Sequence, residues 1–243
     1  MDTLDLNLIQ LLLIISLFAI LQSILGIGLL LFGTPTLMLL GYTYEVVLSI
    51  ILPASIVISA LQVMENYSIV NGKKYLFVYT LPSIGLGLYY ILGLKAYIDI
   101  TFIVGVMLLI IGFIRISKRL NDLLKIVVHN NKKIYCVMMG IVHGVSNMGG
   151  GLLTVYMSTL NHDKIAIRSS IAYWYLIFAL VQLVVLYLSD LLLLSTDILL
   201  VMLASFISYL AVGRIASIKI SHSNYQLLIT FLIFTYGASC ITL

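Results

Sequence analysis

Two glycine-rich interruptions of otherwise apolar sequence carry the residues most able to do chemistry in this chain. The first covers 26–28 (Gly-Ile-Gly) and the second covers 147–151 (Asn-Met-Gly-Gly-Gly), and a short apolar run follows each, at 29–40 and 152–160. If each short run is a helix, its first N–H groups have no partner within the helix and carry a partial positive charge. Glycine lets a ligand approach such a backbone closely. Each interruption therefore predicts a place where an anion can bind.

The helix end alone is too weak to hold an anion that has lost its water. The dipole contributes roughly 0.3–1 kcal/mol, or about 2 kcal/mol when partly buried, whereas dehydrating a charge costs far more. We therefore expect further donors from both interruptions, together with some remaining water. The polar side chains close to them are Gln22, Ser23, Thr34, His143, Ser146, Asn147 and Thr154. The alternative is that the glycines only let helices pack closely.

Ser49 and Ser170 lie at corresponding positions after the two interruptions, and each could face either the substrate or its own helix. His143 and Asn147 are four residues apart, but one histidine and one asparagine do not make a metal site. The residues predicted to bind substrate are Gly28, Gly149, Gly150, Gly151, Gln22, Ser49, His143, Asn147 and Ser170. We expect no metal, no cofactor and no catalytic residue.

The composition identifies the environment that must position these residues. Hydrophobic residues make up 62% of the 243 residues, and charged residues only 9%, against about 25% in soluble domains. So few charges cannot cover a water-facing surface, which excludes a cytosolic enzyme, a secreted disulfide scaffold and a nucleic-acid binder. Cys136 and Cys240 both lie in apolar runs and are expected to be packing residues. The sequence predicts an all-α polytopic membrane protein.

The apolar runs predict two similar halves. Each half has an interrupted apolar piece followed by three further spans, and a shift of 121 positions places Gly28 on Gly149. The shared order suggests an internal duplication. We therefore expect a first membrane repeat at 1–114, a cytoplasmic linker at 115–133 and a second membrane repeat at 134–243. The short run after each break covers only about half of a bilayer core.

Charge predicts the topology. If each interrupted piece is a re-entrant hairpin that returns to its own side, twelve of the 13 basic residues fall on one side and only Lys95 falls on the other. If each interrupted piece crosses the membrane once, eight basic residues fall on one side and five on the other. The positive-inside rule favours the first arrangement. The two halves are then inverted repeats, each a re-entrant half-helix hairpin plus three transmembrane helices, with both termini outside.

The second interruption also resembles a family motif. Residues 147–155 (Asn-Met-Gly-Gly-Gly-Leu-Leu-Thr-Val) resemble the repeated glycine-rich motif of the sulfite exporter TauE/SafE family, also called the TSUP family, and residues 26–35 resemble a degenerate copy. The chain departs from the family pattern at Asn147, which replaces the first glycine, and at Tyr156, which replaces a proline. The resemblance covers nearly the whole chain through the duplicated layout. It implies transport of sulfur-containing anions such as sulfite or organosulfonates.

These observations predict a secondary transporter of small anions in the plasma or inner membrane. Its site would lie between the two glycine-broken hairpins near the bilayer midplane and would open to each side in turn. An anion channel with the same site is the alternative. An integral-membrane enzyme is less favoured because the usual catalytic motifs are absent, and an assembly partner is less favoured because broken helices at the midplane are costly without a ligand path. The expected partners are a small anion and the lipid bilayer. Arg168 could attract anions or only set the topology. The sequence does not determine which anion is transported, the direction of transport, the coupling ion or the oligomeric state.

Overall fold

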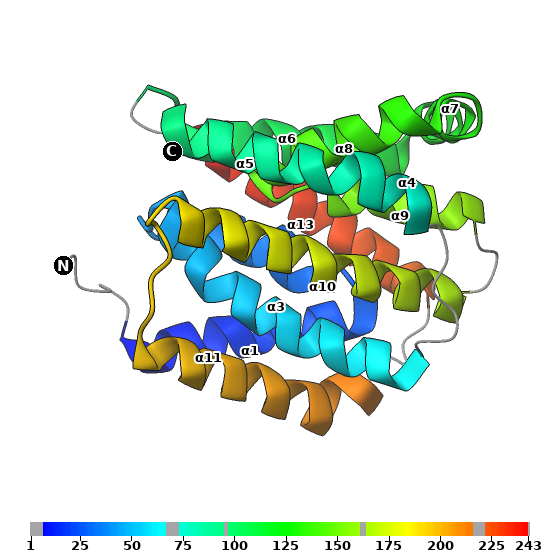
Figure 1. The fold of residues 1–243 in the computed structure, drawn as a ribbon. Helices are drawn as coiled ribbons and strands as arrows, with labels where there is room; N and C mark the ends of the chain where they lie inside the picture. The colour runs from blue at the N-terminus through cyan, green and yellow to red at the C-terminus, as the bar shows by residue number, and fades with distance from the viewer. Residues whose placement is uncertain (1–6, 67–72, 95–96, 161–163, 216–221, 243) are drawn as a thin grey trace.

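The fold was analysed in a computed structural model that describes residues 7–66, 73–94, 97–160, 164–215 and 222–242. Within these residues every regular element is a helix (Figure 1). The first half consists of α1 (Leu8–Leu25), η1 (Leu29–Gly33), α2 (Thr34–Leu39), α3 (Tyr44–Asn66), α4 (Lys73–Tyr75), η3 (Leu76–Thr80), α5 (Leu81–Leu94) and α6 (Ile100–Ile116). The second consists of α8 (Lys132–Ser146), α9 (Gly150–Leu160), α10 (Lys164–Leu188), α11 (Thr196–Ser208), η4 (Tyr209–Gly213) and α13 (His222–Thr242), with α7 (Lys118–Asn130) between the halves. The all-α prediction is confirmed.

Four of the described helical segments are long and apolar enough to cross a membrane. They are Tyr44–Glu65, Lys73–Leu94, Ile165–Leu188 and Thr196–Gly213. A fifth candidate combines α6 with α7, which are bent by 98° relative to each other. The polytopic membrane class predicted from composition is therefore confirmed.

The helices pack in pairs drawn from the two halves. α3 packs against α10 and α6 packs against α13, while α5 packs against α8 and α1 against α11. In Figure 1, α3 and α10 run in opposite directions, as do α5 and α11. That the halves form an inverted repeat stays a prediction, although this arrangement agrees with it.

Both interrupted pieces fold back on themselves. α1 and α3 begin at the same end of the molecule, and α8 and α10 both begin at the other end (Figure 1), so the α1–α2 and α8–α9 pieces each return to the side they came from. The second arms, 29–39 and Gly150–Leu160, each have 11 residues and are about 16 Å long. The first arms are longer: α1 has 18 residues and α8 has 15. The half-span expectation therefore holds for the second arms, but α1, at about 27 Å, nearly crosses the core.

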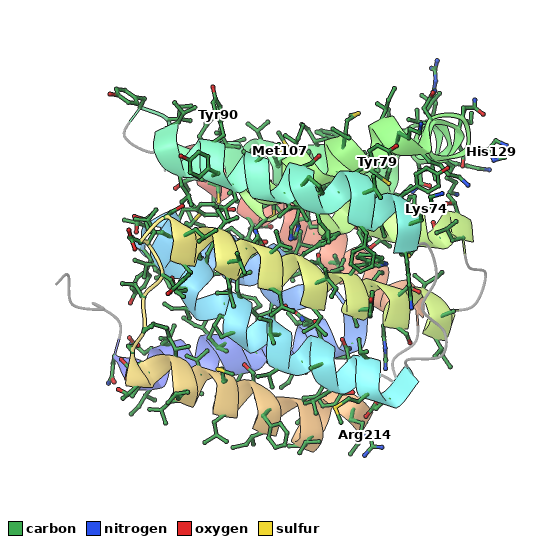
Figure 2. All side chains as sticks on the ribbon, viewed as in Figure 1. Lys74, Tyr79, Tyr90, Met107, His129 and Arg214 are labelled. Carbon is green, nitrogen blue, oxygen red and sulfur yellow. The ribbon has the colours of Figure 1, made fainter. Side chains whose placement is uncertain are left out.

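The basic residues gather at one end of the bundle. α7, the start of α4 and the end of η4 all lie there, as Lys74, His129 and Arg214 show in Figure 2. Lys95 and Lys219 lie outside the described residues. The distribution on which the topology prediction rests is therefore visible in the fold, and we call this end the basic end and the opposite one the outer end.

The segment expected to be a polar linker contains a helix instead. α7 occupies Lys118–Asn130, and its N-terminus is capped by the Ser117 hydroxyl, which accepts a hydrogen bond from the Leu120 N–H at 3.3 Å. Its apolar residues recur at helical spacing, so the segment can lie on an apolar surface as well as in water.

Cysteine labelling tests the orientation. In a variant lacking Cys136 and Cys240, Ser195→Cys lies in the loop after α10 and His129→Cys lies on exposed α7. We expect a membrane-impermeant maleimide to label Ser195→Cys in intact cells and to label His129→Cys only after permeabilisation. The reverse pattern would contradict the assignment of the basic end to the cytoplasm.

Candidate functional site

The two hairpins turn in the same way. Gly26 caps the C-terminus of α1 with φ of 78°, and Asn147 caps that of α8 with φ of 62°, so both residues adopt the left-handed conformation. The Gly26 N–H donates to the Gln22 carbonyl at 2.7 Å, and the Asn147 N–H donates to the His143 carbonyl at 2.8 Å. Asparagine tolerates this conformation better than other non-glycine residues. The departure from glycine at Asn147 therefore keeps the turn.

Gly28 and Gly149 bring each turn against its own first arm. A Cβ at Gly28 would overlap the Gln22 backbone nitrogen, and a Cβ at Gly149 would lie 2.5 Å from the His143 Cβ. No side chain fits at either position. These two glycines, predicted to bind substrate, thus have a packing role in the structure.

Hydrogen bonds between α1 and α3 close the first break. The Gln22 amide donates to the Ser55 hydroxyl at 2.9 Å and to the Ser59 hydroxyl at 3.2 Å, and its oxygen accepts from the Leu29 N–H at 3.3 Å. Gln62 donates to the Ser23 carbonyl at 2.9 Å. A buried glutamine therefore caps the start of the second arm, in the place where an anion was expected.

The second break leaves polar atoms without protein partners. His143 lies where Gln22 lies in the first break, 121 positions earlier, and it is fully buried. Neither of its ring nitrogens has a hydrogen-bond partner, and the same is true of the Tyr175 hydroxyl and the Gln182 side-chain oxygen. The Gln182 side chain lies beside the His143 imidazole, but the two side chains are not in hydrogen-bonding geometry. Leaving such a group unpaired costs about 1–3 kcal/mol, so these are the groups that a polar ligand would satisfy.

Tyr175 reaches the start of α9 because residue 150 is glycine. A Cβ at Gly150 would overlap the Tyr175 hydroxyl, and a Cβ at Gly151 would lie 2.7 Å from Ile111 of α6. The first N–H groups of α9 have no partner within the helix, and its 11 residues place a partial positive charge there. The missing side chain at Gly150 thus brings a hydroxyl donor to a positive helix end.

The two hairpins meet at this point. The Asn147 amide donates to the Thr34 hydroxyl of α2 at 2.9 Å, and Gln182 donates to the Asn147 oxygen at 3.4 Å. A Cβ at Gly150 would also lie 3.5 Å from Ile27 of the first break. Residues from both hairpins and from α10 therefore surround the second break.

One face of α10 connects the basic end to this cluster. Arg168 and Ile171 lie against Gly26, Tyr175 lies against Gly150, and Gln182 contacts Asn147. These positions follow one another at intervals of three, four and seven residues, which keeps them on one helix face. Phe178 belongs to the same face and packs on His143, with ring centroids 5.0 Å apart.

The predicted residues therefore do not form a single cluster. His143, Asn147 and the glycines 149–151 come together at the second break, whereas Gln22 and Gly28 form the closed first break. Ser170 is buried within α10. Tyr175 and Gln182 were not predicted. Within the described residues no three His, Cys, Asp or Glu side chains are grouped as a metal site would require.

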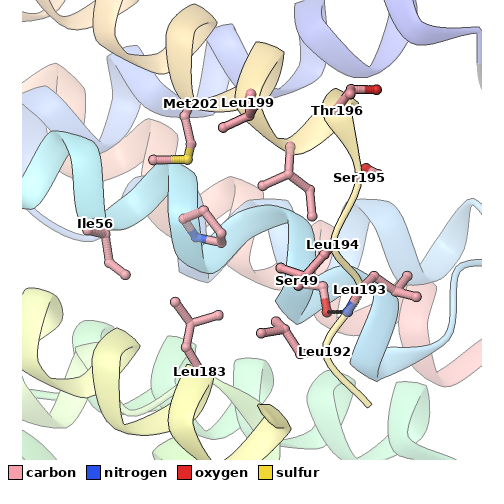
Figure 3. A pocket seen from close by; sticks show the side chains of 12 residues that line it. Ser49, Ile56, Leu183, Leu192, Leu193, Leu194, Ser195, Thr196, Leu199 and Met202 are labelled. Carbon is pink, nitrogen blue, oxygen red and sulfur yellow. Dashed lines mark hydrogen bonds between the residues drawn. The ribbon is translucent and has the colours of Figure 1, made fainter. Parts of the chain in front are cut away.

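Ser49 lies elsewhere, at the outer end of α3. Its hydroxyl donates to the Glu45 carbonyl at 2.8 Å and accepts from the Leu193 N–H at 3.2 Å (Figure 3). It lines a cavity of about 560 Å³ whose other walls, among them Pro53 and Leu199, are mostly apolar. A cavity with so few donors does not suit an anion.

Comparison with known protein families decides the class to which this chain belongs. The family model described as sulfite exporter TauE/SafE matches residues 11–240, nearly the whole chain. This chain is a member of the TauE/SafE family. The match includes both hairpins and α10, so the cluster at the second break lies inside the shared region.

Membership in the TauE/SafE family implies membrane transport of sulfite or related anions. The resemblance drawn from the glycine-rich motif is thereby confirmed. Comparison with curated proteins and with solved structures finds no match for this chain.

Proposed function

We propose that this TauE/SafE protein is a secondary transporter that carries a sulfur-containing oxyanion across the plasma or inner membrane by alternating access. Its substrate binds at the second break, between the start of α9 and the side chains of His143 and Tyr175. The observation that carries this proposal is the group of buried polar atoms without protein partners at a positive helix end.

The chemistry of the cluster suits an oxyanion. The first N–H groups of α9 and the Tyr175 hydroxyl are donors, and a neutral imidazole adds one further N–H. Hydrogen bonds to a charged group contribute about 1.5–3 kcal/mol each, so three or four of them can offset much of the cost of dehydration. The oxygens of a sulfite or sulfonate group can accept all of these bonds.

The cluster also contains acceptors. The Gln182 side-chain oxygen has no partner, and a neutral imidazole has one nitrogen that accepts. An oxyanion that carries a proton, or one that keeps a water molecule, would satisfy them. The site is thus suited to a singly charged or hydrated anion, and no buried carboxylate is needed for that match.

Arg168 supports entry from the basic end. It lies on the same face of α10 as Tyr175, seven residues or two turns away, and its aliphatic chain lies against Gly26. A half-buried guanidinium there attracts anions toward the α10 face. Movement of the two hairpins relative to α3 and α10, as in inverted-repeat carriers, would then expose the site to each side.

Binding to the purified protein identifies the anion class. We expect sulfite, thiosulfate, sulfate, taurine or sulfoacetate to raise the unfolding temperature in a saturable manner, with the preferred compound showing the lowest Kd by titration. Tyr175→Phe removes one donor and should weaken binding of that compound about tenfold. It should not destabilise the ligand-free protein, because the hydroxyl has no protein partner to lose.

Tyr44→Phe is the matched control. The Tyr44 hydroxyl is also buried without a partner, but it lies at the start of α3. Its removal should leave the Kd unchanged. If Tyr175→Phe and Tyr44→Phe bind the anion equally well, Tyr175 is not part of the site.

A further inference from the structure

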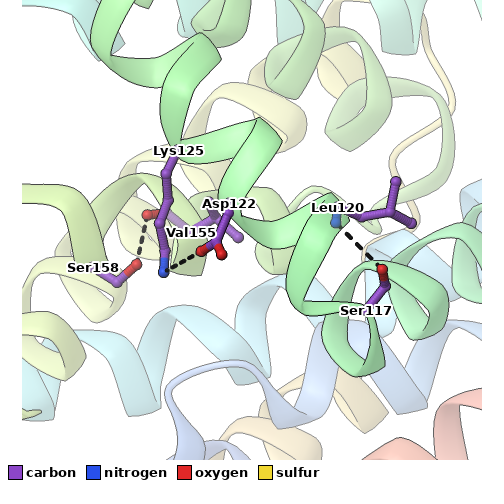
Figure 4. Close-up of polar contacts among 6 residues, drawn as sticks. All are labelled: Ser117, Leu120, Asp122, Lys125, Val155 and Ser158. Carbon is purple, nitrogen blue, oxygen red and sulfur yellow. Dashed lines mark hydrogen bonds and ion pairs between the residues drawn. The ribbon is translucent and has the colours of Figure 1, made fainter.

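The corner between α6 and α7 forms an apolar groove at the basic end. α6 ends at Ile116, the chain turns at Ser117, and α7 continues at 98° to α6 (Figure 4). The groove has a volume of about 370 Å³, and every residue that lines it is apolar. Its walls are Ile110, Phe113 and Ile114 from α6, and Leu120, Leu123, Leu124 and Val127 from α7.

α7 has the pattern of a helix that lies in a membrane interface. Lys118, Asp122, Lys125 and His129 recur at intervals of three or four residues and form a polar stripe, while the groove residues form an apolar one. Leu123 is 48% exposed and Leu120 40% exposed. Helices with a basic face and an exposed apolar face bury the apolar face at the boundary between headgroups and acyl chains.

Positive charge surrounds the groove. The segment 115–133 contains six Lys or Arg residues and a single acidic residue, Asp122. Asp122 pairs with Lys125, 3.5 Å away (Figure 4). Lys118 and Arg119, at the start of α7, are exposed next to the groove residue Leu120. An occupant with an apolar chain and a negative head would satisfy both features.

We propose that this groove binds an anionic phospholipid of the cytoplasmic leaflet. One acyl chain lies between α6 and α7, and the phosphate contacts Lys118 and Arg119. Basic residues close to an anionic lipid surface are attracted to it. A second copy of this chain fits less well, because it would bring an equally basic segment against the first.

Native mass spectrometry of the purified full chain tests this site. The protein is equilibrated with equal amounts of phosphatidylglycerol and phosphatidylcholine that have identical acyl chains. We expect the intact protein to retain phosphatidylglycerol about tenfold more than phosphatidylcholine. Lys118→Gln/Arg119→Gln should abolish this preference. Leu123→Gln, at a half-exposed groove position, should reduce retention of both lipids while the protein stays folded.

Lys73→Gln/Lys74→Gln is the matched control, since it removes two charges from the basic end outside the groove. It should keep the preference. The proposed site is wrong if this control loses as much of the preference for phosphatidylglycerol as Lys118→Gln/Arg119→Gln does. It is also wrong if Leu123→Gln retains both lipids normally. Either result would mean that the lipids are attracted to the surface without a specific site. A dimer mass that Leu123→Gln abolishes would assign the groove to a second copy instead.

Discussion

His143→Gln is expected to lower the affinity for the transported anion at least tenfold, or about 1.4 kcal/mol, while the fold is kept. In the first break, the Gln22 side-chain oxygen accepts a hydrogen bond from the N–H of Leu29, seven residues later, at 3.3 Å. His143 likewise precedes Gly150, the first residue of α9, by seven residues. A glutamine at 143 should therefore cap the start of α9 internally and occupy the donors that the anion needs.

The measurement is a titration of purified His143→Gln with the anion that the original protein prefers, together with its unfolding temperature. His129→Gln, the same substitution on exposed α7, is the control and should bind normally. Unchanged affinity in a folded His143→Gln would mean that the second break does not hold the substrate.

Gln22→Leu should have the opposite effect, a loss of stability with little loss of affinity. The buried Gln22 side chain hydrogen-bonds to three residues, Ser55, Ser59 and Leu29. Such bonds contribute about 0.6 kcal/mol each on average within membranes, and the Leu29 N–H would be left unpaired. We expect the free energy of unfolding to fall by about 2 kcal/mol and the Kd of the folded fraction to change less than threefold.

Thermal unfolding and anion titration on the same preparation separate these two effects. Gln10→Leu makes the same change at an exposed position of α1 and should alter neither quantity. If Gln22→Leu folds normally but loses the anion, the first break belongs to the site and its hydrogen bonds do not close it.

The sequence predicted the fold class, the place of the breaks and the grouping of the basic residues. These features depend on composition and on the spacing of glycines and charges, which are visible without tertiary contacts. The left-handed conformation that the two turns share, at Gly26 and Asn147, was not predicted and is visible only in the structure. The helix at 118–130 was missed because its many charged residues were interpreted as the sign of a polar linker. Its apolar residues nevertheless follow a helical period.

The donors of the candidate site were only partly predictable. Gln22 and His143 are both polar residues just before a break, but only packing against Ser55 and Ser59 shows that the first is satisfied within the protein. Tyr175 lies in an apolar helix, where tyrosine usually marks packing or a membrane boundary. Its place opposite Gly150 depends on how α10 crosses α9, which the sequence of either helix does not determine.

Counterflow in proteoliposomes tests the central claim most directly. Vesicles are loaded with the unlabelled preferred anion, and uptake of the same labelled anion is followed for the original protein and for His143→Gln. A carrier with its site at the second break predicts saturable uptake, stimulated by the internal anion and lost in His143→Gln. Uptake that rises linearly with concentration without stimulation would indicate a channel, and uptake that His143→Gln leaves intact would contradict the site.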